Sequence, residues 1–319
     1  MVATVLSQRL QREVGVLDCG FLDRAPATED PYDGLSCSGT LEGTLRTVIE
    51  LSGRDMRRRK FLLGSAFSAG AFAEPALIAL TVPPTPSTAH TGSGRRIGMA
   101  DVEVLTQQVT QLRQLDCRYG AGRVRAQMVQ LLHHDANELL HGTYSEKTGK
   151  AMLSAVAQAT RATGFMAADV GRHCLAQRYY IQGIDLAMRA GNPLLATEVL
   201  SEMSRMTLTI GQNALTEHDR VRHGRHAVAL ARAGLSFTQG TGDPALAAEL
   251  HTNEGRGLAL LGDTRAARHA VRQAERRYEA VRPHDGASVF YTEAALAADL
   301  GRCLRDIGES AQAITLSTT

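Results

Sequence analysis

Small and apolar residues recur at helical spacing in the second half of the chain, and the clearest copy lies between residues 255 and 274. Successive positions are three, four, five, four and three residues apart, and they are Gly255, Leu258, Gly262, Ala267, Val271 and Ala274. This spacing predicts one helix, a tight turn at Gly262 and a second helix. Because Gly255 and Ala267 have little side-chain bulk, we expect the two helices to pack closely where they cross.

The same spacing occurs twice more, which indicates an internal repeat. One copy is complete and the other lacks only its last place; they comprise Gly164, Ala167, Gly171, Ala176, Tyr180 and Gly183, and Gly301, Leu304, Gly308, Ala313 and Ser317. A helix–turn–helix unit repeated in this way is the signature of tetratricopeptide repeats. We therefore predict an all-α fold, a tetratricopeptide-like solenoid of about four helical hairpins.

A looser copy of the repeat lies between these, with an insertion of about ten residues. Its positions are Ser204, Thr207 and Gly211, followed by Ala227, Ala231 and Gly234. Gly211 takes the place of the turn glycine, and the insertion carries the charged run EHDRVRHG at 217–224. Insertions in such repeats usually form loops on one face, so we expect a loop here.

The first hundred residues have a different pattern. Residues 1–23 contain a short apolar helical stripe, and residues 24–80 form a connector with a helix from Leu41 to about Gly53. Residues 81–98 are rich in Pro, Gly, Ser and Thr, which is the composition of a linker. Helical patterns then occupy residues 99–319, the predicted repeat domain, and are broken once near its start, at Tyr119–Gly122.

The apolar end of the connector, Arg57–Leu80, allows three interpretations. As a membrane span it fails, because Glu74, Pro75 and two glycines interrupt a run of only ~20 residues. As a twin-arginine export signal it has the expected parts, Arg58, Arg59, Phe61, Leu62 and a small-residue cleavage site at Ala71, Phe72 and Ala73. Its position so far into the chain favours the third interpretation, an amphipathic connector helix.

Composition and charge narrow the class of protein. The net charge of +2 is too small for a strong nucleic-acid footprint in the residues present. The cysteines, Cys19, Cys37, Cys117, Cys174 and Cys303, have no paired metal-ligand spacing and no even-numbered disulfide framework. We therefore expect reduced thiols and a cytoplasmic protein.

Catalytic chemistry finds little support in the sequence. There is no nucleotide-binding glycine-rich loop, nucleophile elbow or zinc-protease motif, so we expect neither an enzyme nor a cofactor. His134, Glu138 and His141 would share one helix face, where three ligands can bind a metal. Since no fourth ligand is identifiable and polar helix faces often carry such residues, we predict no metal site.

Three segments carry a family resemblance: VATVLSQRLQREVGVLDCGF (2–21), GFMAADVGRHCLAQRYYIQGIDLAMRAGN (164–192) and ELHTNEGRGLALLGD (249–263). They resemble bacterial transcriptional regulators in which a helix-turn-helix DNA-binding domain precedes a tetratricopeptide sensor domain. The resemblance implies that residues 1–23 are the remnant of the DNA-binding domain, whose DNA-reading helix is absent here. It also implies that the last repeat is incomplete, so the chain is expected to be truncated at both ends.

The resemblance further implies that the first helix of each repeat lines a concave groove. In the last three repeats, the residue after the small residue at the helix crossing is then Arg205, Arg256 and Arg302, and Arg305 lies one turn further on. Guanidinium groups in a groove can bind a carboxylate or phosphate through paired hydrogen bonds. The alternative is that these arginines pair with acidic neighbours such as Glu202, Glu254 and Asp299.

The sequence therefore predicts the sensor and interaction part of a transcriptional regulator. We expect a peptide or protein ligand in the groove, contact with DNA only through the missing N-terminal domain, and no membrane association; a homodimer stays open. The alternative from another class is a twin-arginine-exported repeat protein that acts as an adaptor.

Overall fold

A computed structural model describes residues 33–56, 67, 69–81, 94–241, 243–282 and 291–318, and from Gly34 onward they belong to one compact unit. Every regular element in these ranges is a helix, and the only strand-like pairing in them is an isolated bridge between Arg96 and Thr143. The predicted all-α fold is therefore confirmed for this part of the chain. No helix of the described ranges is both long enough and apolar enough to cross a membrane.

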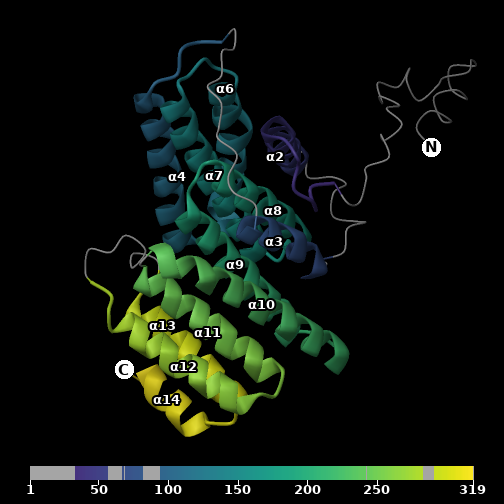
Figure 1. The fold of residues 1–319 in the computed structure, drawn as a ribbon, viewed down its shortest axis with the longest axis vertical. Coiled ribbons are helices and arrows are strands. Elements are labelled where there is room, and N and C mark those ends of the chain that lie inside the picture. The colour runs from purple at the N-terminus through teal and green to yellow at the C-terminus, as the bar shows by residue number, and fades with distance from the viewer. Residues whose placement is uncertain are drawn as a thin grey trace, which may run out of the picture. The chain divides into compact units, whose positions relative to one another are not determined.

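Successive helices pack against one another along the chain (Figure 1). In order they are α2 (Leu41–Met56), η2 (Ala69–Phe72), α3 (Ala73–Thr81), α4 (Met99–Tyr119), α5 (Ala121–Gln130), η3 (Leu131–Ala136), α6 (Asn137–Leu140), α7 (Glu146–Asp169), α8 (His173–Arg189), α9 (Pro193–Gln212), α10 (Glu217–Thr241), α11 (Pro244–Leu260), α12 (Thr264–Tyr278), α13 (Glu293–Asp306) and α14 (Ser310–Thr318). From α7 onward, consecutive helices pair as α7 with α8, α9 with α10, α11 with α12 and α13 with α14. The first helices of these pairs also contact one another, α7 with α9, α9 with α11 and α11 with α13.

Four helix connections share one kind of tight turn. Each has a glycine with positive φ, namely Gly171, Gly191, Gly262 and Gly308, with φ between 67° and 85°. At the predicted turn, Asp263 N donates to Leu258 O at 3.0 Å, closing the end of α11. The Asp263 side chain then accepts from Ala266 N and caps the start of α12. The turn predicted at Gly262 is confirmed.

Small residues lie where helices cross, as the spacing predicts. A Cβ atom on Gly255 would lie 3.4 Å from Ala270 Cβ on α12 and 3.2 Å from Cys303 Sγ on α13, so an added methyl group would be tight against α13. Ala267 on α12 is completely buried at the same junction. Gly164 on α7 has the same role, since its Cβ atom would lie 3.0 Å from the ring of Tyr180.

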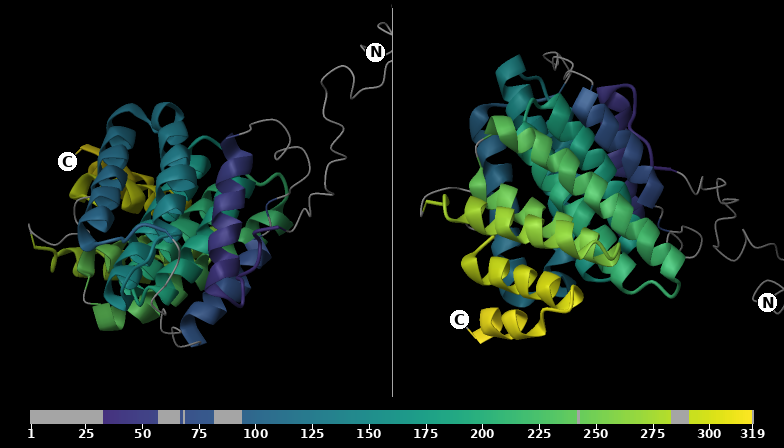
Figure 2. Two further views of the ribbon diagram at one scale, coloured as in Figure 1. Left: turned by 90° about the horizontal axis from the view of Figure 1, so that it is seen from above. Right: turned by 60° about the horizontal axis from the view of Figure 1, so that its bottom comes forward.

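The loop predicted between the helices of the looser repeat is wrong. Residues 217–224 form the first turns of α10, and Gly211 lies inside α9, where its Cβ atom would be 2.8 Å from His223 Cβ. Ion pairs three residues apart, such as Arg222 with Asp219 at 2.9 Å, are compatible with an exposed helical start. The insertion therefore lengthens a helical pair, whose two long helices run side by side in Figure 2.

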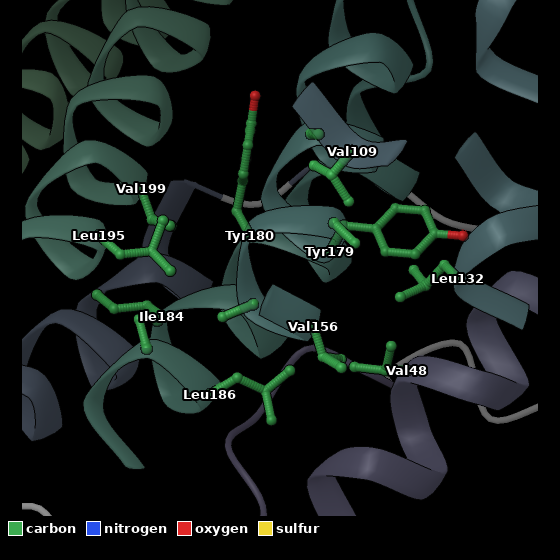
Figure 3. Packing of buried hydrophobic residues seen from close by; sticks show 14 of the residues in the cluster. Val48, Val109, Leu132, Val156, Tyr179, Tyr180, Ile184, Leu186, Leu195 and Val199 are labelled. Carbon is green, nitrogen blue, oxygen red and sulfur yellow. The ribbon is translucent and has the colours of Figure 1, made fainter. Parts of the chain in front are cut away.

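The predicted connector contributes to the core. Helices α2 and α3 both pack on α8, and Val48, Leu51 and Phe72 are buried there. Figure 3 shows Val48 among buried residues of α4, α7, α8 and α9. The predicted cleavage site at Ala71–Ala73 is thus occupied by the start of a packed helix, whereas Arg58, Arg59, Phe61 and Leu62 lie outside the described residues.

Candidate functional site

Two adjoining cavities of about 260 and 400 Å³ are lined by many charged side chains. We call the two together the charged groove. The cavities share four lining residues, Phe165, Glu202, Arg205 and Arg302. Its basic side chains are Arg113, Arg161, Arg205, Arg256, Arg302 and His173, and its acidic side chains are Asp169, Glu198, Glu202, Glu249 and Asp299. The groove is therefore rich in both signs of charge.

Helical spacing brings these side chains to one surface. Most come from the first helices of the four pairs, α7, α9, α11 and α13, which follow one another in space. On α9, Glu198, Glu202 and Arg205 are four and three residues apart and so share a face; on α13, Asp299 and Arg302 are three apart. The surface made by these neighbouring faces belongs to residues far apart in the sequence.

Three of the four arginines singled out in the sequence line the charged groove. Arg205, Arg256 and Arg302 do so, and Arg205 and Arg302 line both of its cavities. Arg305 does not line either cavity; its side chain is largely exposed and pairs with Asp306 at 2.6 Å.

Two of the groove arginines share one carboxylate. Arg256 Nη1 donates to Asp299 Oδ1 at 3.2 Å, and Arg302 Nη2 donates to the same oxygen at 2.7 Å. Arg256 also donates to Gln212 Oε1 at 3.3 Å, and Tyr291 donates to the other oxygen of Asp299 at 3.4 Å. Asp299 therefore links α11 to α13, which is the intramolecular pairing that the sequence left open.

A second cluster ties α7 to α9. Arg161 on α7 donates to Glu202 Oε1 at 2.9 Å and approaches Glu198 at 3.4 Å. Glu202 is 6% exposed, and its other oxygen, Oε2, is buried without a hydrogen-bond partner. Such an unsatisfied acceptor beside a cavity is costly unless something else bonds to it.

Arg205 differs from its neighbours because its guanidinium has no ion pair or hydrogen bond with any described residue. Its Cζ atom lies over the ring of Phe165, 4.7 Å from the ring centre, and Arg113 lies 4.1 Å from the same centre. Arg113 also donates to Asp116 at 2.8 Å, whereas the cation–π contact holds the guanidinium of Arg205 in place without using its N–H donors. The donors of Arg205 are thus available in the groove that this residue lines.

Glu249 on α11 is the acidic counterpart of Arg205. It is half-buried, and its carboxyl accepts a hydrogen bond from the side chain of Ser201. Burial raises the pKa of Glu249 to about 7, although Arg205 and Ser201 act in the opposite direction. The protonation state of the groove consequently changes near neutral pH.

Among the acidic side chains of the groove, the sequence indicated Glu202 and Asp299 as possible partners of the arginines. It did not indicate the others, nor three further lining residues: Asp169, Glu198, Glu249, Arg113, Arg161 and Phe165. The spacing of Glu198, Glu202 and Arg205 is a local signal that could have found three of the lining residues. No such local signal marks Arg113, because its place in the groove depends on how α4 packs against α7.

The histidine-rich segment does not assemble a metal site in the described chain, where no three His, Cys, Asp or Glu side chains are placed to hold an ion. His134 lies in the π-helical stretch η3 and Glu138 in α6, and both line a recess of about 390 Å³ together with His141. His141 follows the end of α6, and its ring bonds to Asn137 O at 2.8 Å. His133 instead bonds to Ser52 Oγ at 3.1 Å.

Comparison with known proteins gives no match, either to family models, to curated proteins or to solved structures.

Proposed function

We propose that the helical unit is the ligand-binding sensor domain of a bacterial transcriptional regulator, built as a tetratricopeptide-like solenoid. Contacts between successive first helices and four similar glycine turns support the repeat architecture. In this proposal the groove takes a peptide or protein segment. DNA is contacted only through an N-terminal head, and the protein works in the cytoplasm.

The observation that carries the proposal is the charged groove with Arg205 in it. A half-buried guanidinium, stacked on Phe165 and lacking a carboxylate partner among the described residues, is arranged to receive an acidic group. Surrounding arginines are already paired, so their charge serves mainly to hold the helices together.

Helix α8 supplies a route from the groove to the N-terminal side of the chain. Tyr180 lines the groove, while the adjacent Tyr179 donates to Asp55 on α2 at 3.2 Å. The two rings leave α8 in different directions (Figure 3). The start of α8 has the same arrangement, because His173 lines the groove and Arg172 pairs with Asp55 at 3.4 Å. A ligand that moves α8 would therefore act on α2.

Chromatin immunoprecipitation from native cells tests the proposal, with the protein tagged at its own locus. A regulator should be enriched at discrete, reproducible DNA sites, and transcription beside those sites should change in a strain carrying Arg205→Ala at an equal protein level. Enrichment no greater than in an untagged strain would contradict the regulator function. Recovery of the protein outside the cytoplasm with a processed N-terminus would favour the exported adaptor.

A further inference from the structure

Arg205 and Glu249 are opposite charges that line the same cavity of the charged groove without forming an ion pair with each other. Each influences the pKa of the other, so they are close enough to interact through space. A gap between a half-buried cation and a half-buried carboxyl group is an unusual arrangement, because direct pairing would normally offset part of the desolvation of both.

Neighbouring charges cannot fill this gap, since they are engaged elsewhere. Asp299 holds Arg256 and Arg302, and Arg161 holds Glu198 and Glu202. One further acceptor belongs to a residue that lines both cavities: Oε2 of Glu202 is buried without a hydrogen-bond partner. In the cavity that both Arg205 and Glu249 line, these two groups form no ion pair with a described residue, and Glu202 keeps one oxygen without a hydrogen-bond partner.

We propose that the charged groove binds a zwitterion, an amino acid or short peptide with free termini, whose carboxylate pairs with Arg205 and whose ammonium group pairs with Glu249 and Glu202. This inference rests on the proposed function of the groove as a ligand site. Both ends of such a ligand would meet charge-assisted hydrogen bonds in a confined space, where they are strongest.

A ligand with anionic groups alone fits less well. Five acidic side chains line the groove, and a phosphate seated on Arg205 would share the cavity with Glu202, Glu249 and Asp299. Like charges at such distances repel, and water screens them little in a half-buried recess. The balance of charges therefore selects for a ligand that also carries a cation.

Cys117 provides a readout in the full chain, because it is exposed and lines the same cavity as Arg205 and Glu249. Its reaction with a thiol reagent can be followed by mass spectrometry of the peptide that contains it. Four probes should be compared at pH 8: mixed tripeptides with free termini, the same mixture N-acetylated, the same mixture C-amidated, and inorganic phosphate. We expect the free tripeptides to slow labelling of Cys117 at concentrations at least tenfold lower than any other probe.

Two substitutions then assign the contacts. Arg205→Ala and Glu249→Gln should each weaken protection by the free tripeptides at least tenfold. Arg46→Ala and Glu42→Gln serve as matched controls, because they alter an exposed ion pair on α2 that does not line the groove; both should leave protection unchanged. Circular dichroism of each variant verifies that the helices are intact.

The outcomes separate this inference from the proposed function. Phosphate or the acetylated tripeptides could protect Cys117 as well as the free tripeptides do, with the protection lost in Arg205→Ala. The groove would then be an anion site, so the zwitterion proposal would be wrong but the groove would still be a ligand site. If no probe protects Cys117, the inference is wrong. The regulator function is then judged by the immunoprecipitation alone.

Discussion

Glu249 is a carboxyl group that the folded protein keeps partly protonated near neutral pH. Burial raises its pKa from 4.5 to about 7. The folded state therefore binds this proton more tightly than the unfolded state, and the free energy of unfolding should fall as the pH rises from 4.5 to 7. Above pH 7 Glu249 is ionised in both states, and the full free-energy cost of burying its charge lowers the stability of the folded protein.

Glu249→Gln should remove this dependence. We expect the variant to gain stability over the original protein at pH 8 by roughly 1–3 kcal/mol, after allowance for partial exposure, and to gain little at pH 5. Urea unfolding followed by circular dichroism at both pH values measures the difference. Equal changes at the two pH values would contradict a raised pKa. Arg205, Ser201, Asp299 and Glu202 are the groups that act on Glu249, and none of them is altered by the substitution.

The same carboxyl predicts how the groove responds to pH. If its ionised form binds an ammonium group, the affinity for the free tripeptide probes should fall about fourfold between pH 8 and pH 6. The ionised fraction of a group with a pKa near 7 falls about tenfold over this range, whereas the ammonium fraction of the tripeptide N-terminus roughly doubles. Protection of Cys117 measured across this range gives the answer. In Glu249→Gln this fall in affinity towards pH 6 should be lost.

Gly164 and Gly122 give a matched test of helix packing. A methyl group on Gly164 would meet the ring of Tyr180 at 3.0 Å and Tyr179 Cβ at 3.1 Å, so Gly164→Ala should lower the free energy of unfolding by roughly 1–3 kcal/mol. Gly122, in α5, has nothing within 4 Å of that position, and Gly122→Ala should raise stability by about 0.5–1 kcal/mol. Urea unfolding of both variants checks the expected opposite signs.

At the scale of the element, α2 is held to the rest of the unit by a buried ionic cluster. The carboxylate of Asp55 is 1% exposed and binds Arg125 of α5, Arg172 and the hydroxyl of Tyr179. Buried charges of this kind stabilise a docking geometry strongly once it is formed, since the loss of one partner leaves the others uncompensated.

Asp55→Ala should therefore loosen α2 in particular. We expect a loss of roughly 3–5 kcal/mol in the contacts of this helix and at least tenfold faster hydrogen exchange at amides 41–56, with α11 and α12 little changed. Mass spectrometry of exchanged peptides measures both regions, and Arg46→Ala on the exposed face of α2 is the control. Equal acceleration in α11 would show that Asp55 supports the whole fold rather than the docking of α2.

The hairpins were predictable and parts of the site were not, for one physical reason. Glycine turns such as that at Gly262 and close crossings such as that at Gly255 are fixed by residues within one repeat, so their spacing is visible in the sequence. The pairing of Arg256 with Asp299 joins residues 43 positions apart, and its choice over Glu254 depends on how α11 and α13 meet. The charged start of α10 was wrongly predicted to be a loop, because polarity alone does not distinguish a loop from a solvated helix.

At the scale of the whole unit, most helix contacts join elements that are neighbours in the chain, but those of α2 do not. Two partners of Asp55, Arg172 and Tyr179, are synthesised 117 and 124 residues after it. At a synthesis rate of ~5–20 residues per second, this interval lasts roughly 6 to 25 s on the ribosome. During that time α2 has emerged without its partner on α8, with Val48 and Leu51 uncovered. We expect a nascent-chain chaperone to bind this segment during that interval.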